Sequence, residues 1–297
     1  FRSVGAKIFW VAASFVLPIA VLLWLMVDGL NGYIHFAQTE VRGGEYQAAL
    51  EKLLEAVLDH QGASLTCSHP AECGDKLKDA AAAVDQGFAA VKSADAKHGV
   101  ALQFTADGLA KRNRQTLTVD QVERRWKAVI GTGLVPDGAA YAATVAELRG
   151  MITHVGDTSN LILDPDLDSY YLMDVTLLAL PQTQDRMGRM RAMAAALHSD
   201  ASPAKRQALA VEAALMQQAD LDRAVGSVQT SFNEDANFYG VSPTLKRNLT
   251  GPLEKYKQTS EALIAMARRM ADGESVPPAE FAAADANADR KSTRLNS

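Results

Sequence analysis

Apolar residues recur along most of this chain at alternating intervals of four and three residues. Between residues 75 and 97 the pattern runs through Leu77, Ala81, Val84, Phe88 and Val91. This spacing places the apolar side chains on one face of an α-helix. Similar stripes predict further helices over residues 31–60, 119–130, 139–163, 166–198, 203–233, 252–271 and 278–288. No stretch of note shows the two-residue alternation of a strand, so the sequence predicts an all-α fold.

The predicted helices indicate how the chain is organised. About six of them are long and amphipathic, and each must bury its apolar stripe against neighbours. One four-helix bundle would leave some of them unpacked. We therefore predict elongated antiparallel helical bundles, arranged as two four-helix bundles stacked end to end. One half is expected to combine residues 28–130 with 244–289, and the other to span 139–233, with the breaker GTGLVPDG at 131–138 between them.

Residues 8–27 form a run of twenty residues without a charge. As a helix, such a run is about 30 Å long, which matches the hydrocarbon core of a bilayer. Trp10 and Trp24 lie near its two ends, where tryptophans anchor membrane helices. We therefore predict a transmembrane helix at residues 8–27. The alternative is a cleaved signal peptide, although the apolar core of a signal peptide is usually shorter, about 7–15 residues.

The charges that flank this run predict its orientation. Arg2 and Lys7 precede it, and Asp28 follows it. Positive residues favour the cytoplasmic side of a membrane. We therefore expect residues 1–7 in the cytoplasm and residues 28–289 in the periplasm, outside the bacterial inner membrane. A cleaved signal peptide would leave the remainder of the chain outside as well.

The two cysteines of the chain, Cys67 and Cys73, lie in the segment CSHPAEC between two predicted helices. In an oxidising compartment they are expected to form a disulfide that closes a short loop, which stabilises the fold by about 2 kcal/mol. The competing interpretation is a metal site that adds His69 and His60 to the two thiols. Because that spacing matches no standard zinc pattern, we expect no bound metal.

Composition narrows the functional class. With 48% apolar and 22% charged residues, the chain is neither disordered nor a polytopic membrane protein. Its net charge of −5 is spread along the sequence, and no large basic face marks a nucleic-acid binder. Motifs such as H-E-x-x-H and G-x-S-x-G are missing, so we expect neither an enzyme nor a cofactor. Residues 290–297 (RKSTRLNS) break the composition and are interpreted as a non-native tail, with an ordinary basic tail as the alternative.

The most distinctive segment is GDTSNLILDPDLDSYYLMD at residues 156–174. In a purely structural interpretation, Asp164 caps a helix that begins at Pro165, with Asp166 and Asp168 in its first turn. In a functional interpretation, the polar side chains around this corner bind a small molecule. The candidate ligand-binding residues here are Asp157, Asn160, Tyr170, Tyr171 and Asp174. A calcium loop is disfavoured because the glycine and the distal glutamate of an EF-hand are missing.

A further candidate follows in the next predicted helix. Pro181 removes a backbone hydrogen bond there, so it is expected to kink the helix and open space between bundle helices. The alternative is that it is a local irregularity that opens no pocket. Arg186, Arg189 and Arg191 follow within two turns. Of these we select Arg186 as a partner for a ligand carboxylate. The alternative is that these arginines form a solvated face.

Three segments carry a resemblance to a known family: KIFWVAASFVLPIAVLLWLMVDGLNGYI, EVRGGEYQAALEKLLEAVLDHQ and, above all, DTSNLILDPDLDSYYLMD. Over residues 1–289 the chain resembles the sensor half of bacterial methyl-accepting chemotaxis proteins, and it is similar in length and helix count to their helical bimodular type. No ligand-binding residue of that type matches a position here, so none is carried over.

The resemblance implies a homodimeric, non-catalytic receptor in the inner membrane. It would bind a small organic acid or amino acid, contact membrane lipid, and signal to cytoplasmic partners through a C-terminal region. Similar sensors also precede histidine kinases and diguanylate cyclases, so these are alternative outputs. Outside the sensor class, the alternative is a membrane-anchored structural protein that binds no ligand.

Overall fold

The protein is all-α, as predicted. A computed structural model describes residues 3–65, 74–130, 138–163, 166–237 and 240–295, and every regular element in these ranges is a helix. The first elements are α1 (Val4–Leu65), α2 (Gly74–His98), α3 (Ala106–Ala110), α4 (Val119–Ile130), α5 (Gly138–Thr158) and the 3₁₀ turn η1 (Leu161–Leu163). They are followed by α6 (Leu167–Asp174), η2 (Val175–Ala179), α7 (Leu180–Ser199), α8 (Pro203–Leu215), η3 (Met216–Leu221), α9 (Asp222–Glu234), α10 (Leu245–Ala271) and α11 (Pro278–Leu295).

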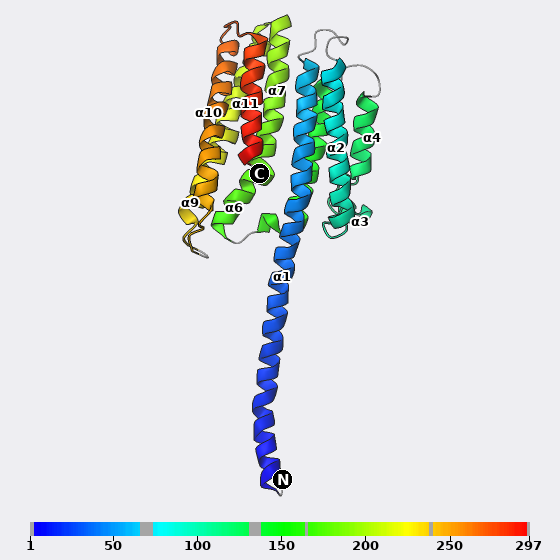
Figure 1. Cartoon of the computed structure of the whole chain (residues 1–297), viewed down its shortest axis with the longest axis vertical. Helices are drawn as coiled ribbons and strands as arrows, with labels where there is room; N and C mark the ends of the chain where they lie inside the picture. The colour runs from blue at the N-terminus through cyan, green and yellow to red at the C-terminus, as the bar shows by residue number, and fades with distance from the viewer. Residues whose placement is uncertain (1–2, 66–73, 131–137, 164–165, 238–239, 296–297) are drawn as a thin grey trace.

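Helix α1 is a single helix of 62 residues. At 1.5 Å per residue it is about 93 Å long. Its N-terminal part projects alone beyond the other helices (Figure 1), and its apolar window is wholly unburied. Among the described residues, it is the one helix long and apolar enough to cross a membrane. Pro18 lies inside this part of α1 without ending the helix.

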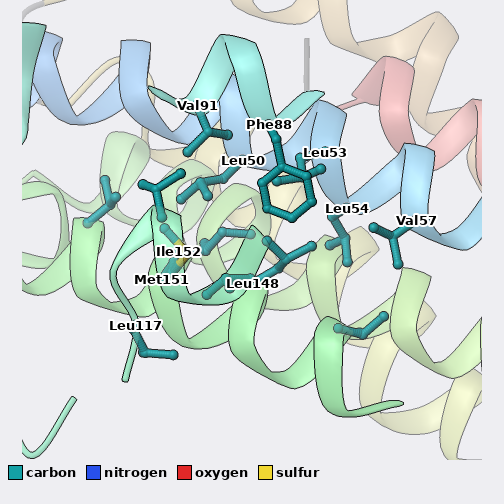
Figure 2. Packing of buried hydrophobic residues seen from close by; sticks show 14 of the residues in the cluster. Leu50, Leu53, Leu54, Val57, Phe88, Val91, Leu117, Leu148, Met151 and Ile152 are labelled. Atoms are coloured by element: carbon teal, nitrogen blue, oxygen red, sulfur yellow. The ribbon is translucent and has the colours of Figure 1, made fainter. Parts of the chain in front are cut away.

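Residues 39–65 of α1 pack with α2, α4 and α5 into what we call the first bundle. Its core is apolar and closely packed (Figure 2). Leu50 and Leu53 of α1 meet Phe88 of α2 and Leu148 of α5 there, and all four side chains are buried. Truncating a buried leucine of this kind to alanine costs about 2–5 kcal/mol of stability. The first bundle therefore holds the C-terminal part of the long helix firmly.

Helices α7, α8, α9, α10 and α11 form the second bundle around a separate apolar core. The predicted end-to-end stacking of two bundles is wrong, because the two bundles lie side by side (Figure 1). The predicted division is also wrong at the C-terminal end. Residues 244–289 pack on α7 and α8 rather than with residues 28–130. The physical reason is that the apolar stripes of α10 and α11 are buried in the same core as those of α7 and α8, and the choice of partner is made by packing between helices rather than by order along the chain.

Two helix boundaries differ from those predicted. Helix α10 begins at Leu245, so Pro252 lies inside it rather than at its start. A proline inside a helix removes one backbone hydrogen bond, but packing of Leu253 and Tyr256 in the second core stabilises the helix around it. Helix α11 continues to Leu295, and Ser292 is buried, so the described part of residues 290–297 extends this helix.

The helix around Pro181 contains a π-helical turn. In η2 the N–H of Leu180 donates to the carbonyl of Val175, five residues earlier. This wider turn lies immediately before Pro181, whose missing N–H prevents the usual bond to Leu177. The predicted disturbance of the helix therefore takes the form of a local π turn between α6 and α7.

Candidate functional site

Two carboxylates predicted around the corner at 156–174 pair with arginines from other parts of the chain. Asp157 forms an ion pair with Arg114, with 2.6 Å between Oδ2 and Nη1. Asp174 accepts hydrogen bonds from two guanidinium nitrogens of Arg223 on α9. Both carboxylates are therefore neutralised by arginines of the chain itself, which leaves neither available as the unpaired anchor of a ligand.

The other corner residues have local roles. Asn160 adopts a left-handed conformation with φ of 68° just after α5, which suits asparagine in a tight turn. The rings of Tyr170 and Tyr171 meet edge to face at 5.5 Å, and Tyr170 is 39% exposed. Helix α6 begins at Leu167 with Asp166 as its N-cap residue, later than predicted. The predicted cap and first residue of this helix, Asp164 and Pro165, lie outside the described residues.

The two cysteines, Cys67 and Cys73, also lie outside the described residues, as does His69, so their disulfide stays a prediction. His60 is buried in the first bundle, where its Nδ1 lies 2.6 Å from the hydroxyl of Tyr141. Within the described part of the chain, no group of three His, Cys, Asp or Glu residues is placed to hold a metal ion.

Arg186 is a buried ion-pair residue rather than part of a solvated face. It is 6% exposed and lies on the inner side of α7. Its Nε donates to Asp220 Oδ2 at 2.5 Å, and its Nη1 donates to Glu212 Oε2 at 2.7 Å. Burial works to lower the pKa of Arg186, but Asp220 and Glu212 outweigh it and raise that pKa above its ordinary value. The carboxylates that bind Arg186 thus belong to the protein itself.

A second π turn positions Asp220. In η3 the N–H of Asp222 donates to the carbonyl of Gln217, five residues earlier. The side chain of Asp220 is fully buried, and its second oxygen accepts a hydrogen bond of 2.7 Å from Gln182 Nε2. Single π turns occur frequently at functional sites because they redirect side chains within a helix.

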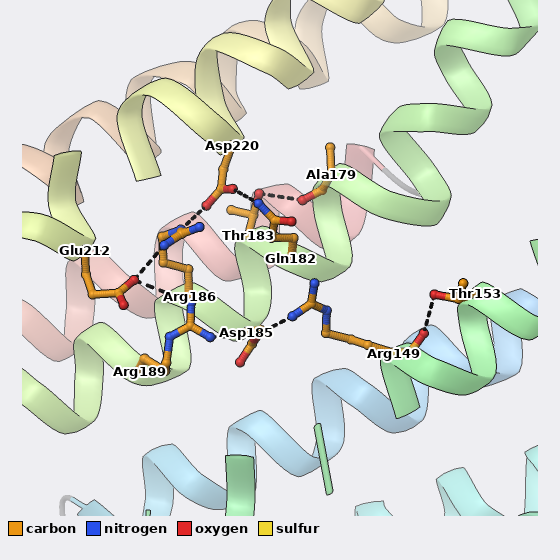
Figure 3. Close-up of polar contacts among 10 residues, drawn as sticks. All are labelled: Arg149, Thr153, Ala179, Gln182, Thr183, Asp185, Arg186, Arg189, Glu212 and Asp220. Atoms are coloured by element: carbon orange, nitrogen blue, oxygen red, sulfur yellow. Dashed lines mark hydrogen bonds and ion pairs between the residues drawn. The ribbon is translucent and has the colours of Figure 1, made fainter. Parts of the chain in front are cut away.

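The ion pairs continue from the second bundle to the first (Figure 3). Arg189 of α7 pairs with Asp185 at 2.7 Å and with Glu212 at 3.4 Å. Arg149 of α5 donates to Asp185 at 2.5 Å. We call this set of three cations and three anions the seam network. Its members are Arg149, Asp185, Arg186, Arg189, Glu212 and Asp220.

A cavity of about 230 Å³ lies between the two bundles, next to the seam network. Helix α1 contributes Leu58 and Gln61 to its wall, and α5 contributes Tyr141 and Val145. Asp185, Gly188 and Arg189 are among the α7 residues that line it. We call this space the seam cavity. It joins three helices of two separate cores, so a molecule bound there would contact both bundles at once.

Beside this cavity, α1 and α7 approach each other closely at two glycines. A Cβ on Gly188 of α7 would lie 2.8 Å from Gln61 Oε1, and a Cβ on Gly62 of α1 would lie 2.6 Å from Arg191 Nη1. The same nitrogen of Arg191 donates to the backbone carbonyl of Leu58 at 2.6 Å. The two helices are therefore joined by direct backbone and side-chain contact.

Arg191 also holds a group of buried carboxylates. Its Nε donates to Asp285 of α11, which is 2% exposed at the side chain. Burial raises the pKa of Asp289 to about 7, and the neighbouring charge of Asp285 acts in the same direction while Arg191 opposes it. Arg191 therefore ties α1 and α11 to α7, and its interactions with the carboxylates of α11 depend on protonation.

Sequence reasoning selected Arg186 but missed its partners and the seam cavity. A signal for Asp220 was present, because it occupies the apolar stripe formed by Leu209, Ala213, Met216 and Ala224. A charged residue at a stripe position predicts a buried partner. Gln61 likewise continues the stripe of Leu50, Leu54 and Val57, but nothing in the sequence pattern indicates that α1, α5 and α7 meet there.

Comparison with protein-family models, with curated proteins and with solved structures gave no match.

Proposed function

We propose that this chain is the extracytoplasmic sensing region of a transmembrane bacterial chemoreceptor, which binds a small molecule in the seam cavity and passes a displacement to the membrane through α1. It performs no catalysis of its own in this proposal. Arg2 and Lys7 before the apolar run, and Asp28 after it, favour a cytoplasmic N-terminus in the inner membrane and a periplasmic sensor.

One observation carries the proposal. Helix α1 runs from Val4 to Leu65 as one helix, with the membrane-compatible run at one end and the cavity residues Leu58 and Gln61 near the other. A continuous helix transmits a shift of one end to the other. A ligand that fits one spacing of α1 and α7 better than another would change the balance between the two spacings.

The three tryptophans of the chain allow a direct test. Trp10 and Trp24 lie in the apolar run, whereas Trp126 is buried in the first bundle, 6.0 Å from the ring of the cavity residue Tyr141. The full chain in lipid nanodiscs, labelled with fluorotryptophan, would be titrated with ligands found by thermal shift. A ligand at a hundredfold excess over its Kd raises the free energy of unfolding by about 2.7 kcal/mol.

We expect bound ligand to shift the ¹⁹F resonances of all three tryptophans. In Tyr33→Pro, which breaks α1 between the membrane and the bundles, ligand should still shift Trp126 but no longer Trp10 or Trp24. Tyr33→Ala is the matched control and should behave as wild type, because Tyr33 is 78% exposed. If Trp10 and Trp24 never respond to a ligand that shifts Trp126, the signalling role is wrong.

A further inference from the structure

The size of the seam cavity limits its ligand. Its volume is about 230 Å³. An engineered protein cavity of about 150 Å³ accommodates benzene. The seam cavity therefore has room for one aromatic ring with a small substituent.

The walls of the seam cavity are largely apolar, so they favour an apolar ligand over water. Leu58, Val145 and Met193 line the cavity together with the ring of Tyr141 and the small side chain of Ala192. Leu58, Tyr141 and Val145 are each no more than 2% exposed. Replacing water at such a surface with an apolar molecule is favourable, because it removes apolar surface from water.

One polar atom of a side chain in this wall lacks a hydrogen bond. Gln61 is 6% exposed, and its Oε1 has no hydrogen-bond partner among the described residues. This oxygen lies beside Gly188, which also lines the cavity. A buried amide oxygen left unpaired costs about 1–3 kcal/mol, so a ligand that donates a hydrogen bond to it removes that penalty. A primary amide both donates and accepts, and its best complement is a group that does the same.

The charged residues at the cavity are already matched. Asp185 and Arg189 line it, but Asp185 binds both Arg149 and Arg189, and Arg189 binds Glu212 as well. The seam network contains three positive and three negative side chains, so it offers no excess charge to either sign of ligand. A charged ligand would have to give up its hydration without gaining a free counter-ion.

We propose that the seam cavity binds a neutral, ring-sized molecule that carries a carboxamide or an equivalent donor–acceptor group, with Gln61 as its polar partner. This inference deepens the proposed function, on which it rests for its signalling consequence. It replaces the organic acid that the family resemblance led us to expect.

Three probes of the same shape test the ligand class: benzamide, benzoate and benzylammonium. Each would be titrated calorimetrically into the full chain in nanodiscs, with empty nanodiscs as the blank. We expect benzamide to bind at least tenfold more tightly than either charged probe. Tighter binding of benzoate would overturn the proposal in favour of an anion site at Arg189, and absence of binding by all three would overturn it outright.

Substitutions in the wall of the seam cavity test whether the probes bind there. Gln61→Met keeps the volume and removes the amide, so benzamide should bind at least tenfold more weakly while toluene still binds. The same change should not lower the free energy of unfolding, because the Oε1 atom that it removes has no hydrogen-bond partner among the described residues. Ala192→Phe should fill the cavity and abolish binding of both probes. The matched control Gln229→Met, on the exposed side of α9, should leave binding unchanged.

Benzamide binding that survives both Gln61→Met and Ala192→Phe would place the ligand elsewhere and overturn the assignment. This failure differs from failure of the proposed function. The ligand class is wrong if benzoate binds best, even when Trp10 and Trp24 respond to it. The signalling role is wrong if benzamide binds as expected but those two resonances never move.

Discussion

Gly188 of α7 lies directly against Gln61 of α1. A Cβ at position 188 would stand 2.8 Å from Oε1 of Gln61 and 2.8 Å from Cδ2 of Leu58, closer than a Cβ atom approaches non-bonded atoms in proteins. The two bundles are thus spaced by a glycine at the point where α1 passes the seam cavity. Because α1 also contains the membrane-compatible run, this contact fixes the position of that run relative to the second bundle.

Gly188→Ala should therefore gain less stability than helix propensity alone predicts. Alanine is favoured over glycine by about 1 kcal/mol inside a helix, but at 188 the added methyl group must displace Gln61 and Leu58. Gly226→Ala is the matched control, because nothing lies within 4 Å of the Cβ position of Gly226 on α9. Denaturant unfolding of the full chain should show Gly226→Ala more stable than wild type, and Gly188→Ala less stable than Gly226→Ala. Equal gains would show that the contact between α1 and α7 is not tight.

Arg186→Met should be the more damaging of two substitutions in the seam network. It leaves the fully buried carboxylate of Asp220 without its cation, and breaking a buried pair in this way costs about 3–5 kcal/mol. Arg149→Met removes an arginine from the same network, but the side chain of Arg149 is 34% exposed, so the loss should be at most about 1 kcal/mol.

Unfolding free energies from denaturant titration check both values. The double variant Arg186→Met with Asp220→Leu should recover much of the loss, because it removes the stranded charge together with its partner. If Arg149→Met cost as much as Arg186→Met, burial would not be what decides the strength of these pairs.

The helices themselves were predictable because amphipathic stripes are local. Residues 75–97 and 139–163 show stripes in the sequence, and α2 and α5 occupy nearly the same ranges. A stripe does not show which helix it packs against, because one apolar stripe can pack against any other apolar stripe. The sequence therefore predicted two bundles but not that α10 and α11 join α7, nor that the bundles lie side by side.

The same distinction applies to the site. Arg186 was selected from its place in the chain, yet its role depends on Asp220, 34 residues later and on a π turn that no stripe reveals. The corner residues Asp157 and Asp174 were selected for their polarity, but Arg114 and Arg223 neutralise them across distances of 43 and 49 residues. Charge pairing between distant helices is decided by packing, which the spacing of residues along one helix does not encode.

Asp289 should make the protein more stable in mild acid. Burial raises its pKa to about 7 in the folded protein, while the unfolded chain releases the proton near the ordinary value of 3.8. The folded state therefore holds an extra proton between about pH 4 and 7. This contribution to the free energy of unfolding is largest below that window and is lost as the pH rises through about 7, with a slope of up to about 1.4 kcal/mol per pH unit.

Asp289→Asn removes the titrating carboxyl group, so the free energy of unfolding should depend less on pH over this range. The measurement is the free energy of unfolding of both proteins between pH 4.5 and pH 8. We expect the free energy of unfolding of the variant to increase relative to that of wild type as the pH rises. Parallel profiles would mean that the carboxyl of Asp289 does not bind its proton more tightly in the folded protein.

His60 should lower the stability of the protein in mild acid, which is opposite to the effect of Asp289. Burial lowers its pKa below the ordinary value of 6.5, so the unfolded chain takes up a proton near that pH while the folded chain stays neutral. Stability therefore falls as the pH drops below about 6.5. In His60→Asn, the asparagine oxygen can still accept from the hydroxyl of Tyr141, so the titrating ring is lost but its hydrogen bond is kept.

The experiment is best done with Asp289→Asn already present, which removes the opposing effect. At pH 8 His60→Asn should be less stable than its parent, because the edge-to-face contact with Trp126 at 5.2 Å is lost. Between pH 8 and 5.5 the parent should lose stability faster than the variant, so the difference in their free energies of unfolding narrows.

Tyr141→Phe is the control. It leaves a ring nitrogen of His60 unpaired at a cost of about 1–3 kcal/mol but keeps the imidazole, so the steep loss of stability in acid should persist. A gap between His60→Asn and its parent that stays constant with pH would show that His60 takes up its proton equally well in the folded and unfolded chains.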